Sequence, residues 1–242
     1  MRAAFEGITH ASVVIPLVYD LELVRTYARN VVDAARAAGV TRLVYNTNTP
    51  VPAEATGLAA YETRRAAEEV FLGSGLPVVV LRPPAYLDNL FSPWNGPALV
   101  NDGVLAYPLA ADRKVAWVSH ADLAEATVAA LEVPGIEGTV LQLAGGDTVD
   151  GPGLAAAFGA ALGREVTYVA LDVDQFRSGL AEVIGEDAAT GVAGLYEYAK
   201  GADPDFFAAD PAEVERVLGV RLGRVQDWVA RQPWDVWAAA KA

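Results

Sequence analysis

The sequence predicts an α/β fold built on a parallel sheet, with a helical C-terminal part. Short apolar runs alternate with segments of helical periodicity along the first 170 residues. One of these runs, residues 77–82, contains an unbroken series of β-branched residues, which is typical of a strand buried on both faces in a parallel sheet. Beyond residue 173 no strand pattern recurs. We therefore expect a sheet domain over residues 1–170 and a helical C-terminal region over residues 171–242.

The expected elements follow one another as strand, helix, strand. A first strand at residues 12–16 precedes an amphipathic helix at 21–38 that Gly39 ends. The rest of the sheet domain comprises strands at 43–46, 77–82, 139–143 and 165–170 and helices at 58–72, 121–131 and 154–162. The tail comprises helical segments at 176–184, 191–198, 211–218 and 225–229.

Composition and charge limit the classes of function. The chain has 242 residues, of which 53% are hydrophobic and 20% charged, enough for one sizeable core. Its net charge of −13 argues against partners such as nucleic acid or an anionic membrane. Without cysteine there is no thiolate chemistry, and no His, Asp or Glu group has the spacing of metal ligands. Since no signal peptide or long apolar run is visible, we expect a cytoplasmic protein without a bound metal.

A glycine-rich nucleotide turn is absent from the start of the sequence. Dinucleotide-binding folds open with a strand, a glycine-rich turn and a helix whose N-terminus holds the pyrophosphate. Only 11 residues precede Ser12, and Gly7 is their sole glycine. The pair Gly135 and Gly138 leads into a strand instead of a helix. The sequence thus predicts a partial Rossmann-like parallel sheet that lacks the glycine-rich nucleotide-binding half.

Four segments together carry a resemblance to a known family. They are NVVDAARAAGVTRLVYNT at 30–47, YETRRAAEEVFLGSGLPVVVLRPPAYLDNL at 61–90, WVSHADLAEA at 117–126 and GTVLQLAGG at 138–146. In this order and spacing they resemble the NmrA-like branch of the atypical short-chain dehydrogenase/reductase superfamily. The resemblance implies a Rossmann-like core with a tail over the substrate, and a chain that is truncated at its N-terminus. It also implies that NAD(P) is not bound in the usual way unless another chain supplies the missing half.

The resemblance further points to catalytic residues. It places Tyr61 and Arg65 at the positions of the superfamily's Tyr-x-x-x-Lys pair, where an arginine on the same helix face can stabilise a phenolate. The alternative is a surface tyrosine beside a basic residue. After the strand at 43–46 come Asn48 and Thr49, which either hydrogen-bond a carbonyl or cap the loop. We expect Tyr61 and Asn48 to be catalytic.

The substrate pocket is expected where the strands end, because ligands of open α/β sheets collect there. The expected substrate-binding residues lie in the loops after the strands and in the tail: Leu17, Tyr19, Thr49, Tyr86, Asn89, Trp94 and Phe176. The two histidines, His10 and His120, are expected to be structural or exposed.

Three functions remain open on the sequence. The first is a cofactor-independent enzyme that catalyses an isomerisation, cyclisation or elimination of a small, largely apolar carbonyl compound. The second is an NAD(P)H-dependent reductase whose nucleotide site another chain completes, and the third is a ligand sensor without catalysis. The strand at 12–16, with residues 3–9, would form an exposed apolar edge, so we also expect a homodimer.

Overall fold

A computed structural model describes residues 1–239, and its centre is a parallel sheet. The strand order is β1-β2-β3-β5, and every neighbouring pair is parallel. The four strands are β1 (His10–Val14), β2 (Arg42–Asn46), β3 (Val78–Arg82) and β5 (Val140–Gln142). In β2 and β3 four of five residues are buried, as expected of strands covered on both faces. The predicted α/β class with a parallel sheet is therefore confirmed.

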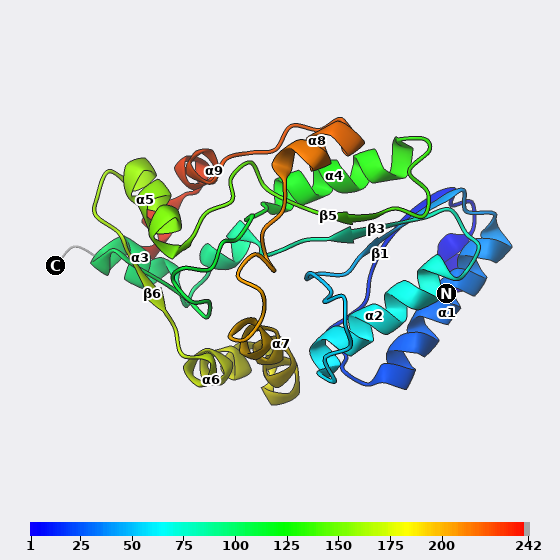
Figure 1. Cartoon of the computed structure of the whole chain (residues 1–242), viewed down its shortest axis with the longest axis horizontal. Helices are drawn as coiled ribbons and strands as arrows, with labels where there is room; N and C mark the ends of the chain where they lie inside the picture. The colour runs from blue at the N-terminus through cyan, green and yellow to red at the C-terminus, as the bar shows by residue number, and fades with distance from the viewer. Residues whose placement is uncertain (240–242) are drawn as a thin grey trace.

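Helices cover both faces of this sheet (Figure 1). On one face lie α1 (Leu21–Ala38) and α2 (Ala59–Leu72), whose apolar sides share a core cluster with Leu43 and Val80. On the other face α4 (His120–Glu132) carries α8 (Pro211–Leu218), and Val214 and Leu218 pack into a cluster with Val44. Helix α1 begins where the Asp20 side chain accepts the Leu23 N–H at 2.8 Å, and it ends at Gly39, whose φ of 72° is left-handed.

A second, smaller sheet lies beyond the ends of the main-sheet strands (Figure 1). The two-stranded parallel sheet of β4 (Val104–Tyr107) and β6 (Thr167–Ala170) packs with α3 (Gly96–Asp102), α5 (Gly151–Leu162) and α9 (Val225–Arg231). Residues 1–239 also contain short 3₁₀ helices at Arg2–Phe5, Leu87–Leu90 and Trp234–Trp237. The sequence predicts β6 but assigns it to the main sheet, and it misses β4 and α3. Each of these two has fewer than eight residues, too short for a clear periodic signal.

The tail does not fold as one unit. Helices α6 (Val173–Ile184) and α7 (Glu186–Ala199) form a hairpin below the strand ends in Figure 1, whereas α8 lies on α4 and α9 on α5. Trp228 and Trp234 of the later part belong to the core around Phe158. Only the hairpin therefore occupies the place expected of a substrate cap, and the division at residue 170 stays a prediction.

Strand β1 stands at one end of the main sheet. Its side chains alternate between exposed and partly buried, and Val14 is 56% exposed. Such an edge is open to pairing, and the expected homodimer stays a prediction. Among the described residues, no helix combines the length and the apolar character needed to cross a bilayer.

Candidate active site

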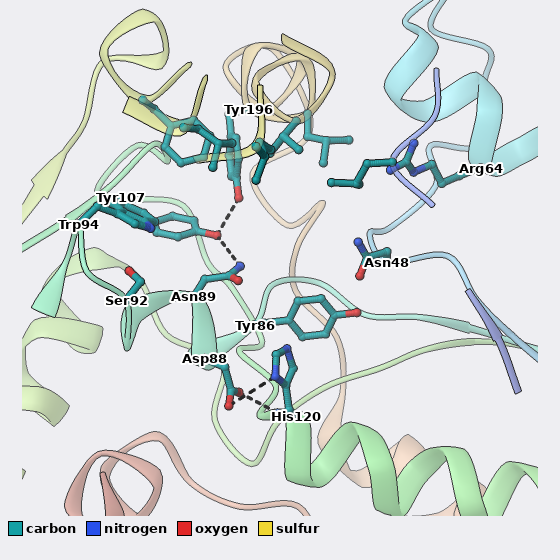
Figure 2. A pocket seen from close by; sticks show the side chains of 16 residues that line it. Asn48, Arg64, Tyr86, Asp88, Asn89, Ser92, Trp94, Tyr107, His120 and Tyr196 are labelled. Atoms are coloured by element: carbon teal, nitrogen blue, oxygen red, sulfur yellow. Dashed lines mark hydrogen bonds and ion pairs between the residues drawn. The ribbon is translucent and has the colours of Figure 1, made fainter. Parts of the chain in front are cut away.

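A cavity of about 440 Å³ lies where β1, β2 and β3 end, between the loops that leave these strands and the α6–α7 hairpin. Its volume is within the range of small-molecule sites. The lining residues are Leu17, Asn48, Arg64, Tyr86, Asp88, Asn89, Ser92, Trp94, Tyr107, His120, Phe176, Leu180, Ile184, Val192, Leu195 and Tyr196. Figure 2 shows Tyr86, Asp88 and His120 on the side of the cavity that lies opposite Tyr196 of the hairpin.

The loop after β2 carries Asn48 into the lining. This asparagine has a φ of 66°, and it is the single non-glycine residue with a positive φ in the part of the chain that the structure describes. Asparagine tolerates this left-handed conformation better than most residues. The Asn46 side chain fixes the turn by accepting the Asn48 N–H at 2.8 Å, and it also donates to the Tyr86 hydroxyl at 3.4 Å. The loops after β2 and β3 are thereby joined at the cavity.

The loop after β3 supplies Tyr86, Asp88 and Asn89. Two prolines follow the strand, and a bridge between Tyr86 and Val118 then holds the loop against the start of α4. Asp88 accepts the His120 N–H at 2.8 Å, and its second oxygen lies 3.6 Å from His120 Nδ1. Burial raises the pKa of Tyr86 to about 12, so this phenol is neutral and can donate a hydrogen bond.

One wall of the cavity is made of aromatic rings from β4, α6, α7 and the turn before α3. Tyr107 of β4 and Tyr196 of α7 meet edge to face with their centroids 5.5 Å apart, and Phe176 of α6 lies 5.1 Å from Tyr196. Trp94 stacks on Tyr107 at 6.5 Å. The Tyr107 and Tyr196 hydroxyls are 2.7 Å apart, and the Asn89 amide donates to Tyr107 at 3.4 Å. Burial raises the pKa of both tyrosines, so both are neutral at physiological pH.

Six residues expected in the pocket lie in its lining: Leu17, Asn48, Tyr86, Asn89, Trp94 and Phe176. The other three do not. Tyr61 is fully buried against Tyr198 and Phe206, and its hydroxyl donates to the Leu195 carbonyl at 3.1 Å.

Tyr19 packs on Gly191, and Thr49 is buried beside Thr47, whose hydroxyl donates to the Thr49 carbonyl. Arg65, the expected partner of Tyr61, instead donates to the carbonyls of Pro52, Ala53 and Glu54. The Tyr61–Arg65 pair is therefore placed in the packing around the site and outside the cavity lining.

Sequence reasoning missed six polar lining residues: Arg64, Asp88, Ser92, Tyr107, His120 and Tyr196. Asp88 lies between Tyr86 and Asn89, which were predicted, so its position in the turn after β3 could have indicated that it also lines the cavity. His120 was expected to be structural or exposed; its side chain is exposed and also lines the cavity. Tyr107 and Tyr196 come from a short strand and a tail helix, and their sequence neighbours do not indicate a common site.

The residues present fit the nicotinamide end of a dinucleotide but not its phosphates. A flat amide-bearing ring matches a cavity with aromatic walls and the amide groups of Asn48 and Asn89. Two helix N-termini near the strand ends already hold carboxylates, because Asp20 caps α1 and Asp88 accepts from the first residue of α4. Before α2, Glu62 accepts the N–H groups of the loop residues Thr56 and Gly57. A second anion there would be repelled.

Protein backbone also fills the space beside the two glycines that follow β5, Gly145 and Gly146. A Cβ on Gly145 would lie 1.8 Å from the Trp117 carbonyl oxygen, and one on Gly146 would lie 2.9 Å from that of Leu222. These glycines permit close backbone packing. Asp150 caps the following helix α5 by accepting the Gly153 N–H at 2.7 Å. The turns that lead from β1 into α1 and from β5 into α5 therefore offer no pyrophosphate site.

The fold is Rossmann-like, and its cavity lies at the strand ends, where open α/β sheets bind ligands. Residues 1–215 match the NmrA-like family, and the chain belongs to it. The chain is 30% identical over 223 residues to an NAD(P)H azoreductase of Xenophilus azovorans, and the aligned region covers 90% of this chain and 73% of that protein. It is 32% identical over 155 residues to quinone oxidoreductase 2 of Escherichia coli, and this aligned region covers 64% of this chain and 52% of that protein.

Solved structures share the fold. The NADPH-dependent quinone oxidoreductase of Escherichia coli superposes with a TM-score of 0.69 at 25% identity, covering 95% of this chain and 77% of that one. The triphenylmethane reductase of Citrobacter sp., in complex with NADP(H), superposes with a TM-score of 0.73 at 21% identity, covering 94% and 78%. The expectation of a chain without a cofactor is wrong on these findings, because the relatives that resemble it are NAD(P)H oxidoreductases.

Proposed function

We propose that this chain forms the substrate side of an NAD(P)H-dependent reductase for small, flat, conjugated acceptors of the quinone type. The observation that carries the proposal is the cavity at the strand ends, with a wall of aromatic rings and a short series of neutral hydrogen-bond donors. The similarity to an azoreductase and a quinone oxidoreductase supports it, since both names describe reduction of conjugated compounds.

The donors form a directed series that ends in the cavity. If the Asn89 amide donates to the Tyr107 oxygen, the Tyr107 hydrogen is free to be donated to Tyr196. The Tyr196 hydrogen then remains for an acceptor oxygen of the substrate. As reduction places negative charge on that oxygen, a preorganised neutral donor stabilises it more than it stabilises the bound ground state.

The cofactor supplies a hydride when bound, and the residues of this chain provide the surroundings of its nicotinamide end. Asn48 and Tyr86 present an amide and a neutral phenol near the ends of β2 and β3. The apolar side chains of the roof, Leu180 and Val192 among them, would shield one side of the ring from water. The phosphates of the cofactor would be held outside residues 1–239, for example by another chain.

The test compares two hydride donors with one quinone. Oxidation of NADPH and of reduced nicotinamide mononucleotide, which lacks the adenylate half, is followed by absorbance with 1,4-naphthoquinone as acceptor. We expect quinone-dependent oxidation of both donors, with kcat/KM values within about tenfold, because this chain holds only the ring end. Heat-denatured protein is the control for the spontaneous reaction.

Two results would contradict the proposal in different ways. If neither donor is oxidised while naphthoquinone still binds, the chain is better described as a ligand sensor. If NADPH is preferred by about a thousandfold, which corresponds to ~4 kcal/mol, the chain holds the phosphates and our interpretation of its helix N-termini is wrong.

A further inference from the structure

Three arginines are almost fully buried, and two of them have their charge well compensated. Arg42, 5% exposed, donates to the carbonyls of Ala130 and Val133 and pairs with Glu137. Arg113, 8% exposed, donates to the carbonyls of Ala199, Ala202 and Asp203. A buried guanidinium needs such acceptors, because it has lost the hydration of its five N–H groups.

The third, Arg64, lacks them. It is 6% exposed, and its guanidinium donates to the neighbouring Thr63 hydroxyl at 3.1 Å, which itself donates to the Ala59 carbonyl. The guanidinium also lies 5.0 Å from the centre of the Tyr19 ring. Among residues 1–239 no carboxylate forms an ion pair with Arg64. A buried cation without an ion-pair partner is costly, so an anion bound in the cavity would stabilise Arg64.

The neighbouring acidic residue does not serve as that partner. Glu68, one turn further along α2, is engaged by Arg82 through two hydrogen bonds, at 3.0 Å and 2.5 Å. This fork neutralises the Glu68 charge. The buried group formed by Arg64, Glu68 and Arg82 therefore keeps one net positive charge, which belongs to the arginine that faces the cavity.

Arg64 lines the candidate active site. Figure 2 shows it on the same side of the cavity as Asn48, across from Trp94 and Tyr107. Between them the roof is apolar, with Leu195 and Val192 in the lining. The site therefore has one cationic end and one aromatic end, which match a flat molecule that carries an acidic group at one edge.

We propose that Arg64 anchors an anionic group of the substrate, so that the preferred substrate is a small aromatic or conjugated carboxylate. This inference rests on the proposed function for the identity of the site, and it adds the charge of the molecule bound there. A carboxylate can accept two parallel hydrogen bonds from the planar guanidinium. A phosphate group, free or on a nucleotide, is the other source of such an anion.

The test is equilibrium binding by calorimetry, without any reaction. 1-Naphthoate is compared with 1-naphthamide, a neutral compound of the same shape, on the wild-type protein and on Arg64→Met. We expect wild type to bind the acid at least about tenfold more tightly than the amide, as charge-assisted hydrogen bonds are worth ~1.5–3 kcal/mol. In Arg64→Met the two affinities should become equal, and Arg64→Lys should restore part of the preference.

Thermal unfolding separates a binding role from a structural one. Because Met replaces an uncompensated buried charge, the unfolding midpoint of Arg64→Met should be unchanged or raised. Arg65→Gln is the matched control: it removes the contacts to the loop at Pro52 and Glu54, so it should lower the midpoint and keep the preference for the acid.

Three results would overturn the inference. They are equal binding of acid and amide by wild type, a preference that survives Arg64→Met, and a fall in affinity for inorganic phosphate or NADPH in Arg64→Met without any preference for naphthoate. The last would assign the anion to the cofactor. Reduction of the neutral naphthoquinone does not depend on an anionic group, so failure of the binding test and failure of the proposed reductase activity are distinguishable.

Discussion

Replacing Tyr196 by Phe removes the final donor of the series in the cavity and little else. The ring stays in contact with Tyr107 and Phe176, whose centroids lie 5.5 Å and 5.1 Å away. The substitution removes the hydrogen bond between the Tyr196 and Tyr107 hydroxyls, whose oxygens are 2.7 Å apart. Its loss should lower the free energy of unfolding by about 1 kcal/mol, which corresponds to a few degrees in the unfolding temperature. The fold should therefore survive, and the effect should be on the reaction.

The expected loss in kcat is about 10²-fold, the scale measured when one donor to a developing oxyanion is removed. The assay is oxidation of reduced nicotinamide mononucleotide with 1,4-naphthoquinone at saturating quinone. Tyr198→Phe is the matched control, because Tyr198 lies on the same helix and packs on Tyr61 and Phe206 outside the cavity lining. It should change kcat by less than about twofold.

The pH dependence provides an independent check. Burial and the adjacent Tyr107 raise the pKa of Tyr196 well above its ordinary value, so the protonated donor form persists as the pH rises. Deprotonation of this residue therefore contributes no fall in kcat between about pH 6 and about pH 9. A Tyr196→Phe variant with wild-type kcat, or a wild-type rate that falls in this range and is flat in the variant, would refute the assignment of Tyr196 as donor.

Two further predictions concern neighbouring residues. Tyr61→Phe should change kcat by less than about threefold and cost about 1 kcal/mol in urea unfolding, because the Tyr61 hydroxyl contacts the Leu195 carbonyl instead of the cavity; a loss of about 10²-fold would restore Tyr61 as a catalytic residue. Gly191→Ala places a Cβ 1.9 Å from the Tyr19 ring, so it should cost about 1–3 kcal/mol and weaken naphthoate binding by displacing α7; unchanged unfolding and binding would contradict this.

The main sheet and the position of the cavity could be predicted because they depend on local patterns. The run at Val78–Arg82 is apolar enough to identify a strand buried on both faces, and its end locates Tyr86 and Asn89. The side chains of the expected Tyr61–Arg65 pair could not be placed relative to the cavity in this way. A shift of one residue along α2 rotates a side chain by about 100° around the helix axis, so Arg64 faces the cavity while Arg65 faces the loop at Pro52.

The aromatic wall lay beyond sequence reasoning for a different reason. Tyr107 and Tyr196 are 89 positions apart, and they meet because the α6–α7 hairpin folds back over β4. Nothing in the immediate neighbours of either residue specifies that contact. Its partners come from the tertiary arrangement, which local propensity does not encode.

The α6–α7 hairpin takes no part in the hydrogen bonding of either sheet. The groups proposed to hold the cofactor ring, Asn48 and Tyr86, lie instead in loops fixed by the sheet, while Phe176, Leu180 and Val192 shape the space above them from the hairpin. Substitutions in the roof can thus reshape the site without a cost to the strands that support the chemistry. Selection can therefore change which molecules are accepted while the reaction stays the same. For engineering of specificity, residues 173–199 form a segment that can be exchanged as a whole between relatives.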